Sequence, residues 1–337
     1  DGAAARALAA EFPDDALVRW ALAEVLLATG ERAEADTLLA QLVESGPERM
    51  RARAAMQRLW VARLRDDHAT ASAALDVARA LAPDWELVRL RSLDLRLDAG
   101  DYRAVLAELS PADGEAAPAD EDSELMLRQL RAHVALEQLD ASEALWERLP
   151  SMVQQRADVQ PIAAEYYIAR GEPVEAVRAL EDLARAEPGD PTLIALYANA
   201  LYESGQTLVA SAQFERAIAL DQGHPEALIG FAQVLLRARK YREARINLDR
   251  AEAGLRGRVR PPATLAHLRV MRARIMVEER ELAQAATLLR RTLEIEGAPS
   301  EGWFYLGEAL SRRALYERYL ALHPAGPLAT RARRAIQ

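Results

Sequence analysis

A spacing of 34 residues recurs through the middle of the chain. It relates Ala164, Ala198 and Ala232, then Ala176, Ala210 and Ala244, and then Leu180, Phe214 and Leu248. A fixed period of this kind indicates one structural unit repeated in tandem, because each unit cannot bury its apolar face alone and packs on the next. The period therefore favours a stacked array over a fold with one central core.

Each repeated unit has the pattern of two helices. Apolar residues recur at steps of three and four on either side of a short break, which contains Gly171 in one unit and Gly205 in the next. Glycine can end a helix because it tolerates the left-handed conformation there, and Pro191 and Pro225 suit a first helical turn. Alanine at a crossing lets two helices approach closely. The sequence predicts an all-α chain of helical hairpins.

This pattern resembles the tetratricopeptide repeat (TPR) family, whose 34-residue unit keeps small residues and one large apolar residue at fixed positions. In residues 191–224 those positions hold Ala198, Ala210, Phe214 and Ala217. The resemblance extends over nearly the whole chain. It implies about nine hairpins stacked as a right-handed α-solenoid, or superhelix.

Extending the register divides the chain into seven segments. We expect an N-terminal helical extension at 1–15, units 1–3 at 16–109, an acidic flexible loop at 110–124, units 4–7 at 125–256, a basic turn at 257–263, units 8–9 at 264–324 and a C-terminal capping helix at 325–337. The ninth unit is too short between Arg313 and Ala314. We expect that residues are missing there; the alternative is that its two helices are fused.

The charge is unevenly distributed. Residues 1–230 carry 22 basic and 41 acidic side chains, whereas residues 231–337 carry 21 and 11. A basic end of this kind could bind an anionic polymer, nucleic acid or a membrane surface, or it could be an ordinary solvated helical surface. Few aromatic residues accompany these arginines, so nucleic acid is unlikely to be the partner. The single lysine among 43 basic residues, together with abundant alanine, suggests a bacterial source.

The sequence offers no motif for catalysis. The absence of cysteine excludes thiol chemistry and thiolate metal sites, there is no glycine-rich phosphate loop, and the five histidines are scattered. We therefore expect no enzyme activity, no cofactor and no metal. No signal peptide or membrane-spanning segment is evident, and a cytoplasmic or a periplasmic location stays open.

The resemblance implies that first helices line a concave groove that binds a partner protein or peptide. Carrying the family's groove positions onto this sequence gives Trp20, Leu27, Met56, Trp60, Arg63, His133, Glu165, Asn199, Tyr202, Gln233, Arg237, Arg274, Phe304 and Arg312. The aromatic residues among them would be either binding anchors or packing residues between repeats. The expected function is a scaffold or adaptor in a bacterial protein complex. A periplasmic scaffold for polysaccharide export or pilus assembly is a further alternative that rests on analogy.

Overall fold

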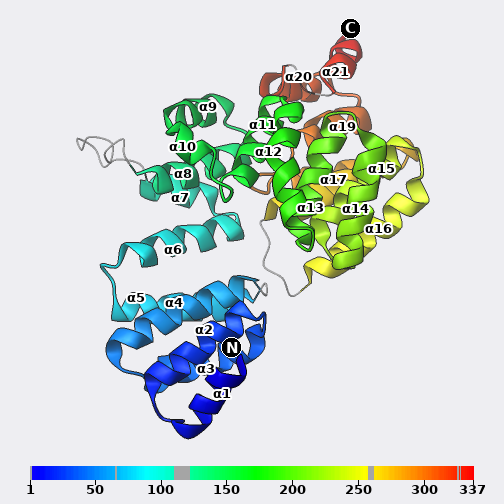
Figure 1. The fold of residues 1–337 in the computed structure, drawn as a ribbon. Helices are drawn as coiled ribbons and strands as arrows, with labels where there is room; N and C mark the ends of the chain where they lie inside the picture. The colour runs from blue at the N-terminus through cyan, green and yellow to red at the C-terminus, as the bar shows by residue number, and fades with distance from the viewer. Residues whose placement is uncertain (1, 65–66, 110–121, 257–261, 325, 327) are drawn as a thin grey trace, which may run out of the picture. The chain divides into compact units, whose positions relative to one another are not determined.

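The computed structural model describes residues 2–64, 67–109, 122–256, 262–324, 326 and 328–337, and these form 21 α-helices (Figure 1). The first ten are α1 (Gly2–Glu11), α2 (Ala16–Ala28), α3 (Arg32–Ser45), α4 (Glu48–Leu64), α5 (His68–Leu81), α6 (Glu86–Ala99), α7 (Tyr102–Leu109), α8 (Ser123–Ala135), α9 (Leu139–Arg148) and α10 (Ser151–Gln154). The remainder are α11 (Gln160–Arg170), α12 (Pro173–Ala186), α13 (Pro191–Glu203), α14 (Thr207–Leu220), α15 (Pro225–Arg237), α16 (Tyr241–Leu255), α17 (Pro262–Glu278), α18 (Leu282–Thr292), α19 (Glu301–Leu310), α20 (Arg313–Leu322) and α21 (Ala329–Ile336).

The helices pack as consecutive antiparallel pairs, so the predicted all-α architecture of stacked hairpins is confirmed. The chain divides into two compact units, Asp1–Leu95 and Arg96–Gln337, and the division falls within α6. Most of the expected acidic loop (110–121) and basic turn (257–261) lies outside the described residues.

The hairpin of α13 and α14 illustrates how the repeat pattern packs. Ala198, Ala210 and Ala217 are fully buried where the two helices cross, and Phe214 fills the space beside them. Small residues at the crossing allow the backbones to approach, and the large ring restores close packing. The same packing of small and large side chains in each hairpin accounts for the 34-residue spacing of these residue types.

The turns between paired helices share one backbone conformation. Eight of them, among the residues described, contain a residue with positive φ: Gly30, Gly100, Gly171, Gly205, Glu137, Arg239, Arg280 and Ser311. Such a residue ends the first helix in the left-handed region, which costs a side-chain-bearing residue about 1 kcal/mol or more and glycine very little. Half of these turns therefore carry a local conformational cost that glycine would avoid.

Replacing Arg239 by glycine should raise the free energy of unfolding of the α15–α16 hairpin by about 0.5–1 kcal/mol, because φ at this position is 60°. The reciprocal change, Gly205→Ala, should lower the free energy of unfolding of the α13–α14 hairpin by about 1 kcal/mol. A β-carbon on Gly205 would contact nothing within 4 Å, so the only cost of the substitution is that of the left-handed backbone conformation. Native-state hydrogen exchange of the two hairpins measures the two effects, and a change of the same sign in both variants would contradict this explanation.

The ninth hairpin has its own short turn. Helix α19 ends at Leu310 and α20 begins at Arg313, with Ser311 in the left-handed conformation. The alternative that the two helices are fused is therefore wrong. A β-carbon on Gly307 would lie 2.9 Å from the Tyr316 ring, so the helices cross closely despite their shortness. The expectation that residues are missing between Arg313 and Ala314 stays a prediction.

Candidate functional site

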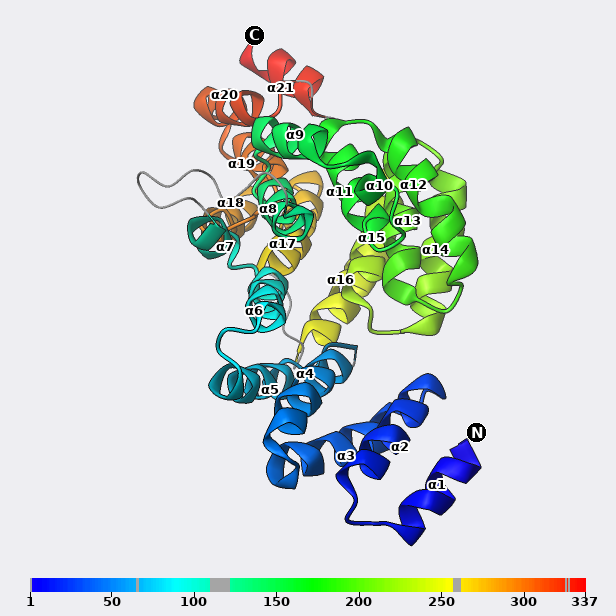
Figure 2. The same ribbon diagram turned by 60° about the vertical axis from the view of Figure 1, so that its left-hand side comes forward.

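The first helices of the hairpins form a continuous layer within Arg96–Gln337. Helices α11, α13, α15, α17 and α19 each contact the next in this series, as can be followed in Figures 1 and 2. Side chains from non-adjacent members also interact: the charge of Glu301 on α19 acts on Glu203 of α13, and that of Arg274 on α17 acts on Tyr202 of α13. These helices therefore face one another across a shared inner surface, which we call the concave surface.

Three carboxylates on the concave surface are held in confined surroundings. Desolvation raises the pKa of Glu165, of Glu203 and of Glu301, and repulsion from Glu301 raises the pKa of Glu203 further. Arg131 and Arg237 oppose the shifts of Glu165 and Glu203, respectively. Glu165 and Glu203 are nevertheless exposed to water. A water-accessible surface enclosed by protein accounts for both properties, because the nearby protein displaces bulk solvent without covering the side chain.

Arginine and tyrosine side chains lie next to these carboxylates. The Arg237 guanidinium lies 5.9 Å from the centre of the Tyr202 ring, and that of Arg274 lies 6.0 Å from the Tyr305 ring. Both separations fall at the outer limit of cation–π attraction. Burial raises the pKa of Tyr305 to about 12, so its hydroxyl is a hydrogen-bond donor at neutral pH. The concave surface thus combines both charge signs with amphipathic rings.

A polar pair links α15 and α17 on the same surface. Gln233 Nε2 lies 3.0 Å from His267 Nε2, and burial lowers the pKa of His267 to about 4, so the imidazole is neutral at pH 7. Gln233 Oε1 is buried and has no hydrogen-bond partner among the described residues. A buried acceptor without a donor is costly, and a donor from a bound molecule would satisfy it.

The other expected groove residues of Arg96–Gln337 differ in accessibility. Asn199 is half-buried and Arg312 is exposed, while His133 Nδ1 is 2.6 Å from Gln138 Oε1 in the α8–α9 turn. Phe304 is fully buried and its ring meets that of Tyr316 edge to face. For Phe304 the packing alternative is the correct one, because a ring with no exposed surface cannot anchor a partner.

The expected groove residues of Asp1–Leu95 also differ in how far they are exposed to solvent. Trp20 and Leu27 are half-buried against the α2–α3 core, and Met56 is buried among the residues of α4 and α5. Trp60 remains 43% exposed. Of these aromatic and aliphatic residues, Trp60 offers the largest accessible surface to a partner.

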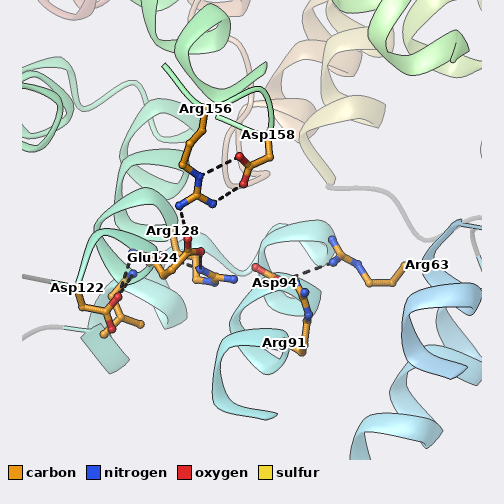
Figure 3. Close-up of polar contacts among 9 residues, drawn as sticks. Arg63, Arg91, Asp94, Asp122, Glu124, Arg128, Arg156 and Asp158 are labelled. Carbon is orange, nitrogen blue, oxygen red and sulfur yellow. Dashed lines mark hydrogen bonds and ion pairs between the residues drawn. The ribbon is translucent and has the colours of Figure 1, made fainter. Parts of the chain in front are cut away.

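Arg63 takes part in a local charge network. Asp94 is only 5% exposed, and its Oδ2 lies 2.8 Å from Arg91 Nη1 and 3.7 Å from Arg63 Nη1 (Figure 3). A buried carboxylate needs such partners to offset its desolvation. The network therefore has a structural explanation on α4 and α6.

A second network, also drawn in Figure 3, belongs to the other unit. Glu124 accepts hydrogen bonds from Arg156 at 2.8 Å and from Arg128 at 3.2 Å. Burial acts to raise the pKa of Glu124, but the two arginines outweigh it and lower the value. Asp158 pairs with the same Arg156, and its pKa is lowered mainly by that hydrogen bond. Carboxylates held ionised by arginines are unsuited to general acid catalysis at neutral pH.

Sequence reasoning missed Glu301 and Arg131 as members of the concave surface. Glu301 occupies the second position of the ninth unit, which is a groove position, so the register contained the signal needed to find it. Arg131 lies outside those positions, and only the curvature of the helix layer brings it to this surface. Among the described residues, no three His, Asp or Glu side chains are placed to hold a metal ion, and no helix has the length and apolarity needed to cross a bilayer.

Comparison with known proteins agrees with this architecture. Residues 171–251 match the family model of anaphase-promoting complex, cyclosome, subunit 3. A solved structure entitled "Crystal structure of APC/C hetero-tetramer Cut9-Hcn1" matches with a TM-score of 0.63 at 14% identity, over 90% of this chain and 59% of that one. The TPR domain of P58(IPK) aligns at 18% identity over 96% of each chain with a TM-score of 0.28. No curated protein matches.

The chain therefore has the fold of TPR-like arrays of stacked helical hairpins. It spans about three-fifths of the Cut9-Hcn1 chain that it matches.

Proposed function

We propose that the protein is a non-enzymatic scaffold that binds a partner protein or peptide along the concave surface of Arg96–Gln337. The observation that carries this proposal is the convergence of accessible ionisable and aromatic side chains from successive first helices, with Tyr202, Arg237 and Arg274 at its centre. Hydrogen-bonding groups and rings in a confined, wet surface suit a polypeptide, which supplies donors, acceptors and apolar side chains along its length.

The similarity to a chain whose structure was solved as part of a hetero-tetramer also favours a protein partner.

The alternative, an anion-binding basic end, receives less support. Arg272 pairs with Asp249 and Glu252 at 2.6 and 2.7 Å, and Arg245 pairs with Glu279. Arginines already neutralised by neighbouring carboxylates release fewer counterions on binding a polyanion. The local excess of positive charge is therefore weaker than composition alone suggests.

Photo-crosslinking should locate the binding surface. With benzoylphenylalanine in place of Tyr202, the full chain should crosslink to a partner in extracts of its source cells at high salt. The same label in place of Leu208, which lies on the second helix α14 and is 89% exposed, is the matched control and should give no such product. Crosslinking from Leu208 alone would contradict the proposal.

The double variant Arg237→Ala/Arg274→Ala should weaken binding of the captured partner by about tenfold or more, which corresponds to 1.4 kcal/mol or more. Circular dichroism of the variant provides the control for folding. If the folded variant binds with undiminished affinity, the partner binds to a different surface of the protein.

A further inference from the structure

A cavity of about 320 Å³ lies where two distant parts of Arg96–Gln337 meet, and its lining residues are different from the concave residues discussed above. One wall is the α8–α9 turn at residues 135–137, and the other is the α18–α19 connection at residues 293–300, with Trp303 and Leu322 beside it. A β-carbon on Gly297 would lie 3.5 Å from the Ala135 carbonyl oxygen, so the two walls are in close contact. The volume falls in the range of sites for small ligands or single side chains.

Charged residues of the lining give the cavity an acidic character. It is lined by the carboxylates of Glu137, Glu294 and Glu296 and by one guanidinium, that of Arg103. Two of these carboxylates already interact with basic side chains of this chain: Glu296 lies 3.8 Å from Arg103, and Glu137 lies 3.2 Å from His323. The Arg103 side chain is 78% exposed, and exposed pairs contribute little. An incoming cation could therefore replace the Arg103 guanidinium beside Glu296.

Apolar side chains also line the cavity, although more of its accessible surface is polar than apolar. Leu136, Leu293, Ile295 and Leu322 line the cavity together with the half-buried Trp303. The Arg318 guanidinium carbon lies 3.9 Å from the centre of the Trp303 ring, so this indole already accepts a basic side chain on one face. A cavity lined by both carboxylates and apolar side chains matches a side chain that has an aliphatic stem and a cationic end.

Ser300 provides an independent indication of a ligand. It lines the cavity, it is 2% exposed, and its hydroxyl has no hydrogen-bond partner among the described residues. Ser300 is the N-cap residue of α19, yet its side chain makes no capping hydrogen bond. Helix capping therefore does not explain a buried hydroxyl here. A guanidinium or ammonium group, which carries only donors, would satisfy the oxygen as an acceptor.

We propose that this cavity is a recognition pocket for one basic side chain, arginine or lysine, of a partner polypeptide. The carboxylates of Glu294 and Glu296 hold the cation, the Ser300 oxygen accepts one of its N–H groups, and Leu136, Leu293 and Trp303 pack along its stem. The inference rests on the proposed scaffold function only in that the basic side chain belongs to a partner. The pocket is assigned independently of the concave surface.

Short peptides test the pocket directly. The full chain is titrated with acetylated, amidated pentapeptides that have a central arginine or lysine between glycines, and with the citrulline peptide, which keeps the size of arginine without its charge. Shifts in the indole NMR signal assigned to Trp303 report binding. We expect at least one basic peptide to shift these signals saturably and the citrulline peptide not to do so. Equal responses to the charged and neutral peptides, or no response, would overturn the proposal.

Two variants separate recognition from folding. Glu294→Gln and Ser300→Ala should each weaken binding of the basic peptide by about tenfold, while Ser300→Ala leaves thermal stability unchanged or higher because it removes an unsatisfied buried hydroxyl. Glu215→Gln, on the exposed face of α14, is the matched control and should bind as the unsubstituted chain does. Unaltered affinity in Glu294→Gln and Ser300→Ala would refute the pocket.

The two proposals fail separately. Arg237→Ala/Arg274→Ala should bind the basic pentapeptide normally, because neither arginine lines the cavity. If the pocket binds and no protein partner crosslinks to the concave surface, the concave-surface proposal alone is wrong. If the partner crosslinks and the peptides do not bind, the pocket alone is wrong.

Discussion

Phe214→Ala should lower the free energy of unfolding of the α13–α15 region by about 3–5 kcal/mol. Phe214 is 1% exposed and packs among Ile194, Ala198 and Ala227. Removing the ring forfeits its burial and leaves a cavity that neighbouring helices can only partly close, because each is fixed by the next hairpin. In a repeat array this loss also weakens the coupling between the flanking units.

The measurement must be local, because the chain has two units and a repeat architecture that need not unfold in one step. Native-state hydrogen exchange of the α13 and α15 amides in the full chain provides it. Leu208→Ala, on the same helix α14 but at an 89% exposed position, is the control and should change stability by less than about 0.5 kcal/mol. Similar exchange in the two variants would refute the packing assigned to Phe214.

The hairpin architecture could be predicted because its signals are local. The spacing of Ala198 and Phe214 and the glycine at position 205 each report on one hairpin and its nearest neighbour. Nearest-neighbour contacts dominate repeat proteins, so a local pattern determines much of the fold. The turns at Glu137, Arg239 and Arg280 are instructive exceptions: they adopt the same left-handed conformation without glycine, so the turn is imposed by helix packing rather than by its own residue.

The accessibility of single groove residues was harder to predict. Met56 and Phe304 occupy groove positions and yet are buried, because large apolar side chains at those positions turn toward an adjacent helix when the crossing leaves space for them. Residues at the same positions with polar ends, such as Glu165 and Arg237, stay accessible because burial would cost their solvation. The position of a residue in the repeat predicts which face of the helix it occupies. The chemistry of its side chain then determines how deeply it is buried.

The cavity beside Ser300 had no sequence signal at all. It arises where residues 135–137 meet residues 293–300, a contact between hairpins far apart in the chain. Only the curvature accumulated over the intervening units brings these segments together, and small changes in each crossing angle add up along the array. No local sequence motif encodes this accumulated curvature.

Gly230→Ala should lower the free energy of unfolding by about 1–3 kcal/mol, although alanine is the better helix former by up to about 1 kcal/mol. Gly230 lies inside α15 and is buried. A β-carbon there would lie 2.3 Å from Cε1 and Cζ of the Phe214 ring, far inside van der Waals contact. The buried ring cannot rotate away without disturbing its neighbours, so steric overlap outweighs helix propensity.

The two substitutions should be strongly coupled. Once Phe214 is alanine, the added methyl group at position 230 enters empty space and regains helix propensity, so Gly230→Ala should become neutral or stabilising in that background. A double-mutant cycle measured by hydrogen exchange of α13 and α15 should therefore yield a coupling energy of about 1–3 kcal/mol. The matched control is Gly189→Ala, where a β-carbon would contact nothing within 4 Å, and its effect should be the same in both backgrounds. Additive effects of Phe214→Ala and Gly230→Ala would mean that ring and glycine do not share this space, and that glycine serves some other purpose in α15.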